Sequence, residues 1–119
     1  MQQLLVAATA LEIGPVLKRL NQPGSNMIPT DVLITGIGLP AATWHITRYL
    51  AIKKPARIIQ AGIAGCFRNT VPLTRVFAVS SESFGDLGVI EQGTWTDVFD
   101  MQLAKPSQFP FSRKELRNP

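Results

Sequence analysis

Three short apolar runs, each followed at once by a turn rich in glycine or hydroxyl residues, constrain the fold of this chain most. The runs cover residues 3–8, 31–35 and 57–61. The first run is continuous rather than alternating, which is typical of a parallel strand that is covered on both faces. Helical spacing of apolar residues follows the first two runs. The sequence therefore predicts an α/β fold whose central sheet is mixed but mostly parallel and is flanked by helices.

The two predicted helices begin close to the turns. Thr9 and Glu12 have the spacing of a capping box, in which a hydroxyl residue caps a helix and an acid three positions on bonds back to it. Pro15 is compatible with that helix only in the first turn. Pro40 suits an early helical position, so the second helix is predicted over residues 41–52.

The second half of the chain gives weaker signals. Residues 76–80 predict a further strand, residues 95–101 a turn of helix, and residues 105–119 a proline-rich basic tail. A chain of 119 residues, 45% of them apolar, is long enough for one domain with a real core. We interpret residues 1–119 as a portion of a single domain.

Charge and cysteine content exclude several classes of function. The net charge of +4 comes from small scattered groups, which favours an ordinary solvated surface over a nucleic-acid interface. Cys66 is the only cysteine, so neither an internal disulfide nor a thiolate zinc cluster can form. The apolar run near the start is far shorter than the ~20 residues that span a bilayer, and no leader pattern surrounds it. We expect a cytoplasmic protein with no metal and no membrane partner.

The three turns should meet at one edge of the sheet, because the carboxyl ends of parallel strands lie together and ligands bind there. Neither glycine turn completes a dinucleotide fingerprint or a P-loop, so no cofactor is indicated. Glu12 is the most informative residue at this edge. Its carboxylate either points back to cap the helix, which its spacing alone favours, or points forward into a ligand crevice. Three weaker candidates have simpler interpretations: His45 as a packed or surface residue, Cys66 as a small buried residue, and Asp86 as a turn residue.

Three segments in this order resemble a known superfamily. They are residues 7–12 (Ala-Ala-Thr-Ala-Leu-Glu), 35–38 (Thr-Gly-Ile-Gly) and 61–65 (Ala-Gly-Ile-Ala-Gly). Together they resemble the nucleoside phosphorylases and nucleosidases. Four later segments, residues 84–88, 98–101, 110–111 and 116–119, are similar to the branch of that superfamily that hydrolyses futalosine in menaquinone biosynthesis.

The resemblance implies hydrolysis of the N-glycosidic bond of a purine nucleoside, with hypoxanthine and dehypoxanthine futalosine as products. It implies that Glu12 activates the hydrolytic water and orders the ribose. Thr9 stands where relatives commonly have methionine, and Ile63 stands where several have serine. The substrate-binding residues that it implies are Thr9, Ile37, Ile63, Ala64 and Gly65.

Two alternatives stay open on the sequence. A phosphorylase would place phosphate where the water lies, but Glu12 would repel that anion, and Arg68 is the one nearby cation that could offset the repulsion. A non-catalytic nucleoside-binding or oligomerisation module would keep the crevice without the chemistry. Hydrolysis is the interpretation that we favour.

The resemblance also implies that part of the machinery lies outside these 119 residues. Superfamily members are considerably longer and supply the acid that protonates the purine from their second half. We therefore expect an N-terminal half that is inactive alone. We also expect an incomplete sheet with an exposed edge, which would favour association with a second copy, most simply as a homodimer.

Overall fold

The fold is described from a computed structural model that covers residues 2–22 and 28–118. The chain divides into two compact units, Met1–Arg68 and Asn69–Pro119. The first unit holds all three apolar runs, at residues 3–8, 31–35 and 57–61. The second unit is built from short antiparallel pairs and loops.

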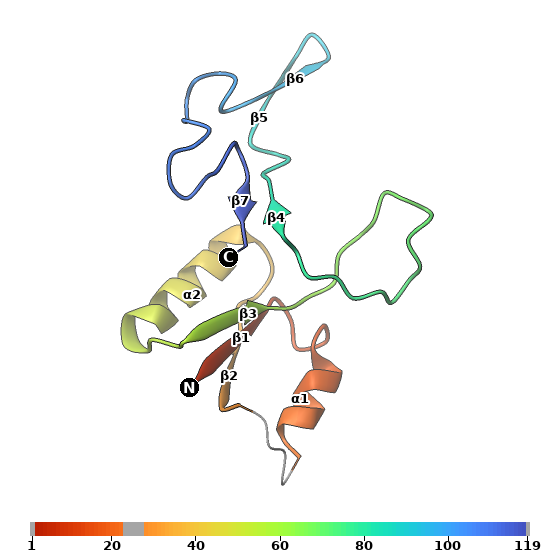
Figure 1. Ribbon diagram of the computed structural model, residues 1–119, viewed down its shortest axis with the longest axis vertical. Coiled ribbons are helices and arrows are strands. Elements are labelled where there is room, and N and C mark those ends of the chain that lie inside the picture. Colours follow the sequence, from red (N-terminus) through yellow and green to blue (C-terminus); the bar gives the residue numbers. More distant parts are fainter. Residues whose placement is uncertain (1, 23–27, 119) are drawn as a thin grey trace. The chain divides into compact units, whose positions relative to one another are not determined.

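A three-stranded parallel sheet forms the centre of the first unit (Figure 1). Its strands are β1 (Gln3–Ala7), β2 (Thr30–Ile34) and β3 (Arg57–Gln60), in the order β2-β1-β3. Both pairings are parallel, so Leu5 lies opposite Val32 on one side and Ile59 on the other. The predicted α/β class with a parallel sheet is confirmed for this unit, and each strand lies within one residue of its predicted bounds.

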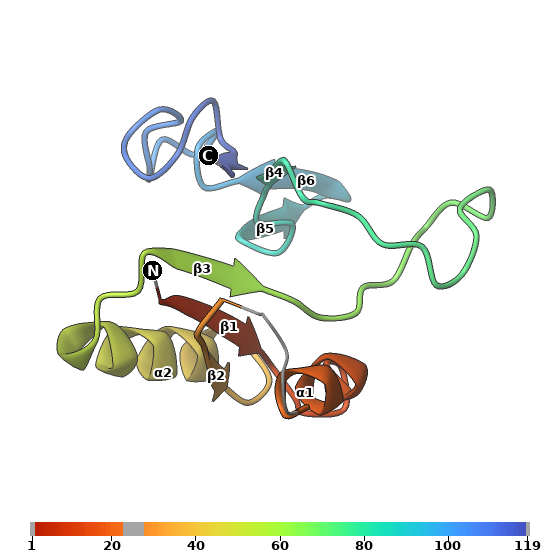
Figure 2. The ribbon, with the colours of Figure 1, turned by 60° about the horizontal axis from the view of Figure 1, so that its bottom comes forward.

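The central strand is covered on both faces. Leu4, Leu5, Val6 and Ala7 are all buried, although alternate residues of a strand point to opposite faces. The two helices, α1 (Gly14–Leu20) and α2 (Leu39–Ile52), lie on opposite sides of β1 in Figure 1. Figure 2 shows β1 between β3 and β2. Helices on both faces explain why the β1 sequence is continuously apolar.

One face of the sheet packs against the start of α1. Leu5, Ala7 and Ile13 form a buried cluster there, and three further apolar side chains pack against it: Leu17, Leu20 and Ala61. Ile13 is only 2% exposed, so it anchors the turn between β1 and α1 to the sheet. This anchored turn contains both Thr9 and Glu12.

Helix α1 begins later than its capping-box spacing predicts. The helix starts at Gly14, and Ile13 precedes it without a side-chain cap. A helix capped by Thr9 would place Pro15 beyond the first turn, where the proline ring clashes with the carbonyl four residues earlier. Because Pro15 has to lie in the first turn, Thr9 and Glu12 belong to the preceding turn instead of the helix.

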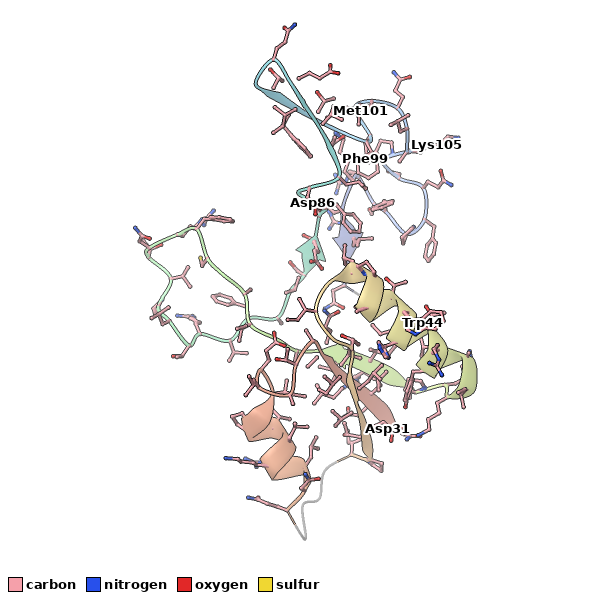
Figure 3. All side chains as sticks on the ribbon, turned by 180° about the vertical axis from the view of Figure 1, so that it is seen from behind. Asp31, Trp44, Asp86, Phe99, Met101 and Lys105 are labelled. Carbon is pink, nitrogen blue, oxygen red and sulfur yellow. The ribbon has the colours of Figure 1, made fainter. Side chains whose placement is uncertain are left out.

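Asp31 ties the far end of α2 to the sheet. Its Oδ2 accepts hydrogen bonds of 2.6 Å from the Tyr49 hydroxyl and from Lys53 Nζ, and these bonds lower the pKa of the Asp31 carboxyl. Figure 3 labels Asp31 and, on α2, Trp44, whose ring lies 5.6 Å from the Arg48 guanidinium. Asp31 stands near the start of β2, at the edge of the sheet opposite the three turns.

The second unit contains two small antiparallel sheets. In one, β4 (Ser81–Glu82) pairs with β7 (Leu116–Arg117); in the other, β5 (Gly88–Glu91) pairs with β6 (Thr94–Asp97). Three phenylalanine rings meet edge to face, with centroids 5.1 and 6.2 Å apart: Phe84, Phe99 and Phe111. Lys114 Nζ bonds to both Asp97 and Asp100 beside these rings.

Two predictions for this unit were wrong. Residues 76–80 form no strand: Val76 is 92% exposed, and the segment receives only isolated hydrogen bonds from Asn118, whose amide donates to the Ser80 carbonyl and whose side chain donates to the Val79 carbonyl, among the described residues. The turn of helix predicted over residues 95–101 begins only after β6, where Asp97 Oδ1 accepts the amides of Phe99 and Asp100. The residues of β6 itself are extended because they pair with β5 across a two-residue loop.

Among the described residues, neither helix is long and apolar enough to cross a membrane.

Candidate functional site

The candidate site lies where the order of the strands reverses. The chain passes from β1 to β2 on one side and then crosses to β3 on the other side of β1. In parallel α/β sheets, ligands bind in the crevice outside the carboxyl ends of the strands at this switch point, here between β1 and β3. Glu12 follows β1 and Gly62 follows β3, so the two turns that contain them flank the switch point.

Backbone hydrogen bonds continue beyond the strands and hold the three turns beside one another. The amide of Ala61 donates to the carbonyl of Val6 at 2.9 Å, and the amide of Gly36 donates to the carbonyl of Ala8 at 3.0 Å. The predicted meeting of the three turns at one edge is therefore confirmed at the level of the backbone.

The carboxylate of Glu12 bridges the first and third turns. Its Oε2 accepts two hydrogen bonds from Thr9, from the backbone amide at 2.8 Å and from the hydroxyl at 3.0 Å. Its Oε1 accepts the backbone amide of Ile63 at 3.4 Å, although the two residues are 51 positions apart in sequence. The side chain is partly buried.

These contacts set the protonation state of Glu12. The Thr9 amide lowers the pKa of the carboxyl most, followed by the Thr9 hydroxyl and the Ile63 amide, while desolvation opposes them. A lowered pKa means that the group is a carboxylate at neutral pH. At neutral pH Glu12 therefore has no proton to donate as an acid, while its negative charge can stabilise a developing positive charge; the lowered pKa makes it a weaker base than an ordinary carboxylate.

Gly62 allows the two turns to approach each other. A Cβ atom at this position would lie 3.2 Å from Glu12 Oε1, closer than an ordinary van der Waals contact. Because Gly62 has no side chain, the carboxylate reaches the backbone of the third turn directly.

The sequence left two interpretations of Glu12 open, a capping acid or a side chain that points into a crevice, and each describes one of its two carboxylate oxygens. Oε2 turns back to Thr9, as in the second half of a capping box, in which the acid accepts the amide of the capping residue. Oε1 turns forward to the third turn. Thr9 and Glu12 were found by their spacing, whereas the contact with Ile63 depends on which strand lies beside β1.

The other predicted substrate-binding residues lie at the same edge, and of these Ile63 contacts Glu12 through its backbone amide. Ile37 and Ile63 each expose 82% of their surface, and Ala64 and Gly65 are exposed too. Among the described residues, none of the four donates a side-chain hydrogen bond to Glu12, and only the Ile63 amide reaches it. The predicted crevice is an open edge in the first unit, because no described element of that unit covers it.

The three weaker candidates, Cys66, His45 and Asp86, lie outside the site around Glu12. The prediction that Cys66 is buried was wrong: the residue is exposed, and its Sγ forms hydrogen bonds with the backbone of Arg68. His45 lies exposed on α2, and Asp86 is exposed in the second unit. In the described ranges, no three histidine, cysteine or carboxylate side chains gather where they could hold a metal ion.

Comparisons of the chain with protein-family models, with curated proteins and with solved structures found no match. A function for this chain therefore rests on its own residues and their geometry.

Proposed function

We propose that this chain binds a purine nucleoside at the edge between β1 and β3 and supplies the water-activating half of a nucleosidase. The observation that supports this most is the Glu12 carboxylate, which is charged, partly buried and held between two turns at the switch point. The resemblance of the turns to nucleosidases leads to a phosphorylase-like domain fold as the setting, and the resemblance of the four later segments leads to futalosine as the substrate.

The proposed reaction breaks the bond between C1′ of the ribose and the purine nitrogen. The electron pair of that bond leaves with the purine, and the sugar passes through an oxocarbenium-like state that an anionic carboxylate stabilises. Water bonds to C1′ and gives its proton to Glu12. Phosphate is the poorer nucleophile here, because Glu12 would repel it and has no ion-pair partner among the described residues.

The purine also needs a proton, and Glu12 cannot supply it while acting as the base. The only other carboxylic acid in the first unit is Asp31, which lies at the opposite edge of the sheet and is bonded to Lys53 and Tyr49. We therefore propose that the 119-residue chain binds nucleoside but does not release purine by itself.

Titration of the chain with inosine, a hypoxanthine nucleoside, tests this function. We expect millimolar or tighter binding, about −4 kcal/mol or better, with amide NMR shifts concentrated at residues 9–12 and 61–65. Residues 105–108 of the second unit serve as an internal control and should not shift. Shifts confined to the second unit, or no binding, would contradict the proposal. Release of hypoxanthine by this chain would contradict the proposed need for a further acid.

We also propose that a second copy of the chain pairs with the outer edge of β3. All four residues of β3 are exposed, including Ile58 at 45% and Ile59 at 40%, and β3 pairs only with β1 in the described structure. An antiparallel pairing of two β3 strands would place Ile58 opposite Ile59 of the other copy and Arg57 opposite Gln60. This register pairs apolar with apolar side chains and keeps the two arginines apart.

Ile59→Lys tests the pairing, because it places a charge on the open strand. In sedimentation experiments over a range of concentrations, the original chain should associate and Ile59→Lys should stay monomeric. Ile52→Lys is the matched control, since Ile52 is 82% exposed but lies at the end of α2. Equal loss of association in both variants, or a chain that is monomeric throughout, would refute pairing through β3.

A further inference from the structure

Thr9 gives both of its hydrogen-bond donors to a single oxygen of Glu12. Its backbone amide and its hydroxyl lie 2.8 and 3.0 Å from Glu12 Oε2. The other oxygen, Oε1, has only the longer contact of 3.4 Å with the Ile63 amide. The two oxygens of this carboxylate are therefore unequal.

This inequality determines which oxygen can act. An oxygen that accepts two short hydrogen bonds has little remaining capacity to accept a proton, whereas one with a single long bond keeps a free lone pair. Oε1 also faces Gly62, where no side chain blocks the approach. The available oxygen therefore points toward the switch point between β1 and β3.

We propose that Thr9 is a positioning residue that fixes the Glu12 side chain so that Oε1 faces the bound nucleoside. This inference rests on the proposed function of the site. It differs from the sequence expectation, in which Thr9 contacts the substrate. The hydroxyl of Thr9 has one proton, and the structure commits that proton to Glu12.

The position of Thr9 in the fold suits this role. Thr9 follows the buried strand β1, and Ile13 anchors the other end of the same turn in the core. A rigid turn loses little entropy when it orders the carboxylate, because its backbone is already fixed. Thr9 and Glu12 therefore form one preorganised unit at the edge of the sheet.

Thr9→Val removes the hydroxyl and keeps both the shape of the side chain and the backbone amide. Two probes are compared at pH 7: inosine, and an inosine analogue whose ribose oxygen is replaced by a protonated imino group. The analogue carries the positive charge of the oxocarbenium-like state. We expect the ratio of the two affinities to fall about tenfold in Thr9→Val, since hydrogen bonds to charged groups are among the stronger ones.

Thr9→Ser restores the hydroxyl and should keep that ratio within about twofold of the original. A second readout is the pKa of Glu12, followed by carbon NMR of its carboxyl. This pKa should rise in Thr9→Val and stay low in Thr9→Ser, because the Thr9 hydroxyl lowers it in the original chain. If Thr9→Val does not fold, Thr9→Ala removes the same hydroxyl and takes its place in both measurements.

The outcomes separate this inference from the proposed function. If Glu12→Gln changes the affinity ratio but Thr9→Val does not, Thr9 only closes the turn, and the positioning role is refuted while the function of Glu12 stands. If neither variant changes the ratio, the proposed function fails, and the positioning role fails with it.

Discussion

Glu12→Gln is expected to reduce the preference of the chain for the cationic nucleoside analogue over inosine by about ten- to a hundredfold at pH 7. Glutamine has nearly the shape of glutamate but no charge, so it loses the attraction for a positive sugar ring. The effect lies in this range because Glu12 is only partly buried, and solvent weakens the interaction of two charges. Calorimetric titration of both variants with both probes measures it.

The same preference should depend on pH in the original chain. Because the pKa of Glu12 lies below its ordinary value, the carboxylate stays charged above about pH 4.3, the usual value for glutamate, and loses its charge only in more acidic solution. The preference should therefore be constant at neutral pH and decline as the pH falls through the lowered pKa. Glu12→Gln should show no such decline.

Glu82→Gln is the matched control, because Glu82 is an exposed acid on β4 of the second unit. It should leave the preference and its pH dependence unchanged. If Glu12→Gln binds both probes as the original chain does, the Glu12 carboxylate stabilises its own turn but does not interact with the bound ligand. The non-catalytic nucleoside-binding module would then be the better interpretation of the first unit.

The first unit could be predicted largely from its sequence because its signals are local and agree with one another. The apolar run that forms β1 needs cover on both faces, and helical spacing follows the first and second runs at the right distance to provide it. Pro15 is the exception: its effect on the start of α1 outweighs the capping-box spacing of Thr9 and Glu12.

The second unit was harder to predict because its strands depend on partners. Residues 76–80 have the composition of a strand, yet composition supplies no neighbouring backbone to pair with. The β5–β6 hairpin was missed, although its loop gives a signal. Gln92 and Gly93 both have positive φ, at 48° and 79°, as a two-residue hairpin loop requires, and glycine at the second position favours that conformation.

The candidate site could be predicted only in part, less completely than the first unit as a whole and better than the second unit. Spacing alone identified the Thr9–Glu12 pair, since the two residues are three positions apart. The bond from Glu12 to Ile63 depends on β3 lying beside β1, and three strands in sequence do not specify which of them are neighbours. Glycine at position 62 is the one local sign of a close approach, and it became interpretable only once the strand order was known.

Gly88→Ala is expected to disrupt the β5–β6 hairpin. A Cβ atom at Gly88 would overlap the carbonyl oxygen of Thr96 on the paired strand and lie 2.8 Å from the Trp95 ring. The ring could move, but the carbonyl belongs to the backbone of β6, so the two strands would have to separate. Overpacking of this kind typically costs about 1–3 kcal/mol, which is large for a hairpin of four residues in each strand.

Amide hydrogen exchange measures the loss of the hairpin. In Gly88→Ala, protection should fall at the paired amides of β5 and β6, while β1 should keep its protection because its core belongs to the first unit. Gly85→Ala is the matched control, since a Cβ atom there would have no neighbour within 4 Å. Equal protection of the hairpin in both variants would mean that β6 can shift without unpairing. A simultaneous loss of protection in β1 would mean that the two units unfold together rather than independently.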